Sequence, residues 1–406
     1  MVTQRLRSDA EIWTFQDIVE HILDVFDNSR AGRPMRMARR AARDALRELH
    51  MNHRWGYYEG SHFFRTSADQ TSGTIEYTHA GYDTGTGTGT DSYAARTVLL
   101  TGATWPSDVV EYTIIIDDVH YSIESRVNDT EITLPDGENP GADVSSGTSY
   151  TLYKEAYQLP RGMAEMGVLV DLDNDRVVPV VSSDQQVTRK HFQYDSPDTP
   201  WVAAMRNSGV YLNNMALIFT SSPDSAKEYV MTYQRRPREL KTELYNTGTA
   251  TVASGSTSVT FAGGAALTAQ HVGCVIRFGD ATTDPTPVPG AIDGDDNPFV
   301  DQGVILSRTA TTCTIDTAVS QAYTAVKYSI SDPVDIELGI MLTAYQKLCE
   351  ALYADLNKRS ASERQQLWTN ARMALRFAME RNNQSMYSPW YAPYDPFRDV
   401  TVTDDD

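Results

Sequence analysis

The stretch Val98-Leu-Leu-Thr-Gly102 returns later in the chain as Val259-Thr-Phe-Ala-Gly263, and it begins a longer match between two regions of the sequence. After one inserted residue the alternating residues also correspond: Val110, Tyr112, Ile114 and Ile116 align with Val272, Cys274, Ile276 and Phe278, then Ile123 to Arg126 with Ile305 to Arg308, and Tyr150 to Leu152 with Tyr328 to Ile330. Chance rarely preserves both alternation and turn order over roughly sixty positions. We therefore predict two mutually similar β modules.

Each predicted module consists of short runs with period two, separated by turn-rich segments. This spacing is typical of a small β-barrel or sandwich. The first module contains a run from Thr84 to Thr90 that alternates Gly and Thr, for which we predict a flexible loop. The second has a longer loop, from Asp280 to Asp301. Repetition of one module favours a scaffold over a single active site.

Helical periodicity frames this β material. Residues 14–50 are predicted to form a helical hairpin, because apolar residues recur at helical spacing and Gly32 with Pro34 separates two periodic stretches. Thr14 and Asp17 form a capping-box pattern at the first helix.

The helical period returns after Pro333, with one apolar face from Ile336 to Leu356. Ser360 and Glu363 form a second capping-box pattern, before a last helix that we expect to end near Arg381. We predict that the two terminal pairs of helices pack together as a bundle.

Residues 158–240 are predicted to form short strands. Among them, Leu217 to Asp224 and Tyr229 to Tyr233 are expected to pair as a β-hairpin that turns at Pro223-Asp224. The predicted fold class is α+β: terminal helices form a helical bundle that carries a β-wing and two inserted, mutually similar small β-barrel or sandwich modules. Its segments are residues 1–66, the N-terminal helical hairpin; 67–157, the first β module; 158–246, the central β-hairpin and sheet wing; 247–331, the second β module; 332–382, the C-terminal helices; and 383–406, an extended C-terminal arm.

Two charged rows run along the predicted N-terminal helices. The first helix has an acidic row and the second a basic row, at steps of three and four: Asp17, Glu20, Asp24 and Asp27, and Arg36, Arg40, Arg43 and Arg47. Complementary charge allows the rows to pair within one subunit or between neighbours. The arginine row has three interpretations: a solvated or internally paired face, an ionic interface between subunits, or a surface toward DNA in a channel.

The composition indicates a soluble, folded protein and argues against several classes. The net charge of −19 over 406 residues opposes general binding to nucleic acid, because phosphate contacts need a positive surface. No window approaches the roughly 18 apolar residues of a membrane helix, and the N-terminal residues lack the apolar core of a signal peptide. We therefore expect synthesis in a cytoplasm and no membrane partner. The three cysteines form no CxxC pair, which argues against a disulfide framework or a zinc site.

Motifs of catalysis are not found, and we predict no enzyme activity, no cofactor and no metal. Phosphate-binding, zincin and serine-hydrolase patterns do not occur. Asp171-Leu-Asp-Asn-Asp175 lacks the Gly and Glu of a calcium loop, whose sixth and twelfth positions here hold Arg176 and Ser182. Asp293-Gly-Asp-Asp-Asn297 is interpreted as a solvated turn, with a weak cation site as the alternative. A carbohydrate-cleaving enzyme would need two carboxylates about 5 to 10 Å apart in a cleft, and the sequence selects no such pair.

The segment Met386-Tyr-Ser-Pro-Trp-Tyr-Ala-Pro-Tyr-Asp-Pro-Phe397 has too many prolines for a helix or a central strand, so we predict an extended arm. Aromatic residues in a proline-stiffened segment lose little entropy on docking and bury a large area. The arm either folds back onto its own subunit or docks on a partner, and the candidate docking residues are Met386, Tyr387, Trp390, Tyr391, Tyr394 and Phe397.

This order of elements resembles the head-to-tail adaptor (connector or neck) proteins of tailed bacteriophages. The most similar regions are the N-terminal helical pair and short motifs: Tyr150-Thr-Leu-Tyr153 followed by Tyr157-Gln-Leu-Pro160, the Ser222-Pro-Asp224 turn, and Tyr233-Gln-Arg-Arg-Pro-Arg-Glu-Leu240. Small adaptors lack one or both β modules, so the resemblance assigns no role to residues 72–157 and 249–331.

The resemblance implies a structural virion protein of the neck: a homo-oligomeric ring of twelve copies that joins the portal protein to a tail or nozzle protein and continues the DNA channel. Its helices would face the channel, where DNA only passes, and Met386 to Phe397 would reach into the portal. An acidic wall would repel passing DNA. Apart from the resemblance, we expect the β modules to decorate the ring or to contact capsid, fibres or tail. The alternative is another virion protein, a capsid decoration, tail or fibre component, that binds through its β modules.

Overall fold

The computed structural model describes residues 12–26, 31–79, 96–154, 156–181, 202–207, 215–219, 223, 225–264, 266–285 and 299–386. The fold is mixed α+β, with mostly antiparallel sheets and four α-helices among these residues. The chain divides into two compact units, one of residues 1–58 with 236–406 and the other of residues 59–235. The first unit holds the helices and one β module, and the second holds the other module and two further sheets.

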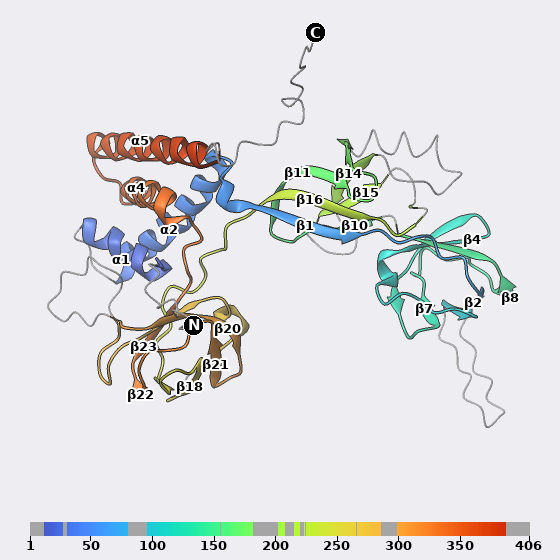
Figure 1. Cartoon of the computed structure of the whole chain (residues 1–406), viewed down its shortest axis with the longest axis horizontal. Coiled ribbons are helices and arrows are strands. Elements are labelled where there is room, and N and C mark those ends of the chain that lie inside the picture. Colours follow the sequence, from blue (N-terminus) through green and yellow to red (C-terminus); the bar gives the residue numbers. More distant parts are fainter. Residues whose placement is uncertain are drawn as a thin grey trace, which may run out of the picture. The chain divides into compact units, whose positions relative to one another are not determined.

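Helices from both ends of the chain lie together in the first unit (Figure 1). Their buried side chains form one hydrophobic core. The helices are α1 (Phe15–Val25), α2 (Gly32–Asn52), α4 (Leu338–Leu356) and α5 (Ala361–Met386). Ile18, Leu46 and Tyr345 are among the buried residues of this core. The Tyr345 hydroxyl also donates to the carbonyl oxygen of Ala42 at 3.0 Å, which ties α4 to α2.

The predicted capping signals lie at the helix ends. The Thr14 hydroxyl accepts from the Asp17 N–H, and the Asp17 carboxylate accepts from the Thr14 N–H, so the capping box of α1 is confirmed. Before α5, the Ser360 hydroxyl accepts from the Glu363 N–H at 3.3 Å.

The last helix is longer than predicted. We expected it to end near Arg381, but α5 continues to Met386, so the residues assigned to an arm from 383 onward begin inside the helix. The buried Asn382 side chain explains some of this extension, because its Oδ1 accepts from the Gly56 N–H at 3.1 Å and fixes the last turns on the core. The first proline in the sequence after Met386 is Pro389, and a proline is unfavourable inside a helix.

The second β module consists of seven strands: β17 (Thr249–Val252), β18 (Ser258–Ala262), β19 (Val275–Phe278), β20 (Gln302–Arg308), β21 (Thr312–Ile315), β22 (Tyr323–Val326) and β23 (Tyr328–Ser331). Their order is β22-β17-β18-β21-β20-β19-β23. Only Lys327 separates β22 from β23, so one bent segment forms both edges and the pairings close on themselves. The module has its own core, which includes Phe261, Ile276 and Tyr328.

The first β module consists of eight strands: β2 (Thr74–Thr78), β3 (Thr97–Thr101), β4 (Thr113–Ile116), β5 (Val119–Ser122), β6 (Ser125–Arg126), β7 (Glu131–Thr133), β8 (Val144–Thr148) and β9 (Tyr150–Tyr153). They form two sheets, with the strand orders β6-β7-β3-β2-β8 and β5-β4-β9. Taken in chain order, each pairing has a counterpart in the second module. The one difference in this comparison is that the continuous β20 corresponds to the broken pair β5 and β6.

The base of each module is closed by a backbone bridge. Gln70 pairs with Leu152 in the first module, and Tyr245 pairs with Ile330 in the second, in both cases through two N–H to carbonyl hydrogen bonds of 2.8 to 2.9 Å. The chain therefore enters and leaves each module side by side.

A glycine stands three residues after each of these bridges. Gly73 and Gly248 have φ angles of +86° and +89°, a region that favours glycine. A Cβ at either position would collide with a carbonyl oxygen of the neighbouring strand, that of Thr101 or that of Ala262. The two modules thus begin with the same backbone conformation in the same close approach.

Two four-stranded sheets complete the second unit. One has the order β1 (Glu59–Arg65), β16 (Glu228–Arg235), β11 (Met163–Asp171), β12 (Arg176–Val178), and we call it the wing sheet. The other has the order β10 (Ala156–Gln158), β15 (Met215–Phe219), β14 (Ala203–Asn207), β13 (Val180–Val181). Buried residues of both sheets, among them Tyr157, Phe219 and Tyr229, form one core.

The hairpin predicted across Pro223-Asp224 is wrong. Its two strands, β15 and β16, belong to different sheets: β15 pairs with β10 and β14, whereas β16 pairs with β1 and β11. The physical reason is that Glu59 to Arg65, which we predicted within the N-terminal helical segment, form β1 and take one edge of β16. Burial of β1 alternates along the strand, and it belongs with the second unit.

Several predicted segments lie outside the described residues. These are the loop from Thr84 to Thr90, the acidic turn from Asp293 to Asn297, and the residues after Met386.

Candidate functional site

A bidentate ion pair fastens the start of α1 to the second β module. Arg277 lies in β19, and its Nη1 is 2.7 Å from Asp17 Oδ1 while its Nη2 is 2.9 Å from Asp17 Oδ2. Nη2 also donates to the carbonyl oxygen of Ile12 at 2.7 Å, and Nε lies 3.3 Å from Gln302 Oε1. The two charged side chains are 2% and 0% exposed. Removal of either one would strand the other charge away from water.

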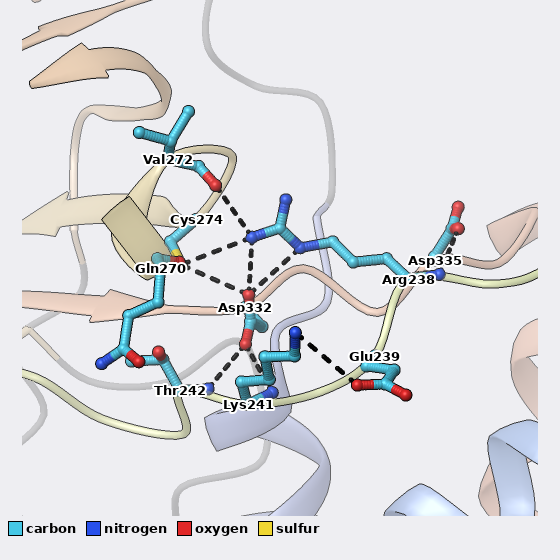
Figure 2. Close-up of polar contacts among 9 residues, drawn as sticks. All are labelled: Arg238, Glu239, Lys241, Thr242, Gln270, Val272, Cys274, Asp332 and Asp335. Carbon is cyan, nitrogen blue, oxygen red and sulfur yellow. Dashed lines mark hydrogen bonds and ion pairs between the residues drawn. The ribbon is translucent and has the colours of Figure 1, made fainter. Parts of the chain in front are cut away.

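Asp332, the residue after β23, is the centre of a second polar contact (Figure 2). Its Oδ1 accepts from Arg238 Nε at 3.1 Å and from Arg238 Nη2 at 2.8 Å. Its Oδ2 accepts from the backbone N–H groups of Lys241 at 2.7 Å and Thr242 at 2.6 Å. Arg238 Nη2 also donates to the Val272 carbonyl oxygen at 3.0 Å. This buried carboxylate therefore holds the connecting segment 238–242 against the module.

Cys274 joins this contact as a protonated thiol. Its Sγ lies 3.3 Å from Asp332 Oδ1 (Figure 2), and burial together with that carboxylate raises the pKa of Cys274 to about 12. The thiol is thus a hydrogen-bond donor and not a nucleophile near neutral pH. Beside it, Gly273 has a φ of +82°, and a Cβ there would collide with the Arg238 guanidinium. A glycine at this position leaves room for the ion pair.

Lys154 stands at the matching position of the first β module. It comes two residues after Leu152, as Asp332 comes two residues after Ile330, and these two apolar residues form the bridges at the base of the modules. The residue that follows the last strand thus carries a charge in both modules, and the sign is opposite.

Acidic and aromatic side chains surround the Lys154 ammonium. Its Nζ is 2.6 Å from Asp108 Oδ2 and 2.8 Å from Glu111 Oε2. It also lies 5.3 Å and 5.5 Å from the ring centroids of Tyr112 and Tyr157. Burial lowers the pKa of Lys154, but hydrogen bonds to the two carboxylates outweigh burial, and the pKa is raised. Because Tyr157 belongs to β10, this ammonium links the first module to the neighbouring sheet.

The residues of the acidic row of α1 differ in burial. Asp17 is buried and serves Arg277, Glu20 is half-buried and Asp24 is exposed. Asp27 lies outside the described residues. Asp17 therefore joins the helix to the β module, a role that the row pattern did not predict.

The basic row of α2 is exposed along its length: Arg36, Arg40, Arg43 and Arg47. Arg40 Nε and Arg47 Nη1 lie 3.3 Å and 3.8 Å from the carboxylate of Asp44 on the same helix. Arg43 Nε donates to the Leu240 carbonyl oxygen at 2.8 Å. These contacts lie within one chain, and an interface with a neighbouring copy or with DNA stays a prediction.

Of the candidate docking residues of the arm, the structure describes only the first, Met386. Met386 ends α5. The others lie outside the described residues: Tyr387, Trp390, Tyr391, Tyr394 and Phe397.

The portion of the chain that the structure describes contains no group of three His, Cys, Asp or Glu side chains arranged to hold a metal ion. The acidic run at Asp171 instead closes a turn, since its carboxylate accepts from Asn174 at 2.8 Å and lies 3.3 Å from Arg176 Nε. Over the same described ranges, no helix is long and apolar enough to cross a bilayer.

Sequence reasoning missed the charged residues that anchor the modules. Arg277 had a usable signal, because a single arginine inside the buried strand Val275–Phe278 must find a partner. Asp332 and Lys154 had none, since each follows a strand at a position where an exposed charge is ordinary.

Comparisons with protein-family models and with curated proteins found no match to this chain.

Proposed function

We propose that this chain is a structural subunit of a tailed-bacteriophage neck, a head-to-tail adaptor that forms a ring between portal and tail and continues the DNA channel. The observation that carries the proposal is the common core of α1, α2, α4 and α5, because an adaptor of this layout needs helices from both chain ends in one body. By the resemblance, the ring has twelve copies, and its partners are the portal and a tail or nozzle protein. The chain has no catalytic role in this proposal.

We further propose that the two β modules are copies of one small β-barrel, inserted into this helical framework and joined to the wing. The matching strand order, the bridges at Gln70 and Tyr245, and the glycines Gly73 and Gly248 support a common origin. Two similar surfaces on every subunit would suit contacts with capsid, fibres or tail.

Charge and the C-terminal residues also support an adaptor. A net charge of −19 suits a channel wall that must let DNA pass without holding it. The aromatic residues after α5, from Tyr387 to Phe397, suit capture of a portal groove.

Deletion of residues 387–406 tests the docking role of the arm. The cut belongs after Met386, because a cut at 383 would remove helical residues just beyond the buried Asn382. We expect unchanged thermal unfolding and loss of co-sedimentation with the portal. A full-length variant with serine at Trp390, Tyr391, Tyr394 and Phe397 is the matched control for length. Unchanged co-sedimentation of both variants would remove the arm from the proposal.

The alternative is a virion protein that binds through its β modules. Excision of residues 71–151 distinguishes it from the adaptor. A short glycine-serine linker can join Gln70 to Leu152, because the two residues are already bridged. An adaptor would still form rings on the portal, visible by negative-stain microscopy. A decoration, tail or fibre protein would lose its place in the virion instead.

A further inference from the structure

The wing sheet has an apolar row that its own core does not use. Phe63, Val230, Val170 and Val177 stand opposite one another across β1, β16, β11 and β12. Residues in such register point to the same face of a sheet. Phe63 and Val177, at the two ends of the row, are 67% and 64% exposed.

The opposite face of the same sheet is filled. Side chains alternate along a strand, so the neighbours of the row point the other way. Those neighbours, including Phe64, Tyr229, Leu169 and Val178, belong to the core of the second unit. An apolar row that crosses four strands and faces away from the core is the usual sign of a protein-binding surface. We call it the wing row.

The charges around the wing row are mainly acidic. Glu59 and Glu165 lie opposite Gln234 at one end of the sheet. Arg65 and Glu228 form a cross-strand pair of opposite sign at the other end. The four charged residues are exposed, and three of them are carboxylates.

Helix α5 in the first unit exposes an apolar pair of its own. Met373 and Phe377, one turn apart, are 53% and 64% exposed. On the other side of α5, Ala371, Leu375 and Ala378 are buried in the helical core. The pair therefore does not belong to the packing between α4 and α5.

The charges around this helical pair are mainly basic. Arg372, Arg376 and Arg381 are exposed beside it. Glu380 is the acidic residue of this face, and its Oε1 lies 3.0 Å from Arg376 Nε. The α5 face thus has the apolar character of the wing row and the opposite charge.

We propose that the wing row of one copy binds the Met373–Phe377 face of α5 of a second copy of this chain. Helix-on-sheet packing buries both apolar surfaces, and the acidic rim of the sheet meets the basic rim of the helix. The contact joins two different surfaces, so each copy offers one of each and the contact repeats from copy to copy. Such a head-to-tail contact closes into a ring when the rotation allows. The inference deepens the proposed ring and rests on it.

Two single variants and their mixture test this contact. Phe63→Asp removes the wing row and Phe377→Asp removes the helical face, and each protein alone should lose assembly on the portal. When they are mixed, the intact α5 face of the first fits the intact wing row of the second, so we expect dimers and nothing larger by native mass spectrometry. Val127→Asp, at an exposed valine of the first β module, should assemble like the unchanged chain.

Single-cysteine cross-linking covers the case of weak association in solution. The three natural cysteines are buried, so Val177→Cys and Phe377→Cys add the exposed thiols. A mixture of these two proteins should form disulfide dimers several times faster than either alone or than a mixture with Val127→Cys. Equal rates in all mixtures, or a disulfide formed within one monomer of the double variant, would overturn the proposal. Rings that persist in Phe63→Asp and Phe377→Asp would remove this interface and leave the adaptor function standing. Mixed dimers of the two variants, together with an unchanged chain that does not bind the portal, would keep the interface and remove the adaptor function.

Discussion

The two β modules have corresponding strand order, and they differ in how they are attached. Both are closed by a bridge at the base and begin with a glycine of positive φ, Gly73 or Gly248. The residue after the last strand is Lys154 in one and Asp332 in the other, and each finds partners of opposite charge. The comparison teaches that a few backbone features are shared by the modules, while one charged position differs with the surroundings to which each is attached.

The two attachments also differ in their contact with water. Asp332 is almost fully buried and accepts from Arg238 and from the backbone N–H groups of two further residues. The Lys154 side chain is 11% exposed, and its partners Asp108 and Glu111 are 45% and 17% exposed, whereas Asp332 is 1% exposed and its partner Arg238 35%. Because Asp332 is almost inaccessible to water and its loss would leave two backbone N–H groups as well as Arg238 without their carboxylate, we expect the attachment of the second module to depend more strongly on its charge.

Asp332→Ala should have the largest effect of the changes considered. It leaves the Arg238 guanidinium and two backbone N–H groups without their acceptor, and we expect a loss of about 3–5 kcal/mol in the free energy of unfolding of the first unit. The matched change Lys154→Ala should cost about 1 kcal/mol. Denaturant unfolding gives the sizes, and hydrogen exchange should show faster exchange of the amides of Lys241 and Thr242.

A control inside the second module separates loss of attachment from general damage. Asp301 is also buried, but it accepts from Ser320 and Tyr323 within the module. Asp301→Ala should destabilise the module without faster exchange at residues 241 and 242. Equal costs for Asp332→Ala and Lys154→Ala would contradict the difference that we draw between the two attachments.

The common strand pattern could be predicted from the sequence because it depends on local periodicity. The match of Val98-Leu-Leu-Thr-Gly102 with Val259-Thr-Phe-Ala-Gly263 identifies β3 of the first module as the equivalent of β18 of the second. The alternation of apolar residues along these strands indicates which side chains enter the core of each module. Strand partners outside the modules could not be predicted, because β16 has two long strands as neighbours and periodicity does not choose between them. The hairpin across Pro223-Asp224 failed for this reason.

The candidate site was less predictable than the fold. Asp17 was selected as one of an acidic row, and its partner Arg277 lies 260 positions later in the chain. Nothing local in either segment specifies that contact. A buried strand with one arginine predicts a partner of opposite charge, and only the tertiary fold shows which carboxylate it is.

The glycines at the base of the modules give a second, smaller test of the comparison. Gly73→Ala and Gly248→Ala each place a Cβ against a strand carbonyl in a positive φ region, and we expect similar losses of about 2–3 kcal/mol. Gly141→Ala and Gly255→Ala are matched controls, because their φ values are +74° and +75° and a Cβ there meets nothing within 4 Å. These should lose about 1 kcal/mol each. A large loss in one module alone would contradict a shared architecture.

The smallest expected effect is a pH dependence confined to the first module. The pKa of Lys154 is raised above its ordinary value of 10.5, so its contribution to stability is complete below that pH and is lost as pH rises through the folded-state pKa. Tyr112 and Tyr157 face the ammonium, and burial raises the pKa of both. Both tyrosines therefore stay neutral over the pH range in which an ordinary tyrosine begins to ionise. Lys154→Gln should therefore be less stable than the unchanged chain at pH 9, by about 1 kcal/mol, and the difference should shrink above the ordinary lysine value. Denaturant unfolding gives the free energy of unfolding of both proteins at each pH. The difference between the two values removes the contribution of all other titrating groups. A difference that stays constant to the alkaline limit would mean that the packing of the lysine stem, and not its charge, attaches this module.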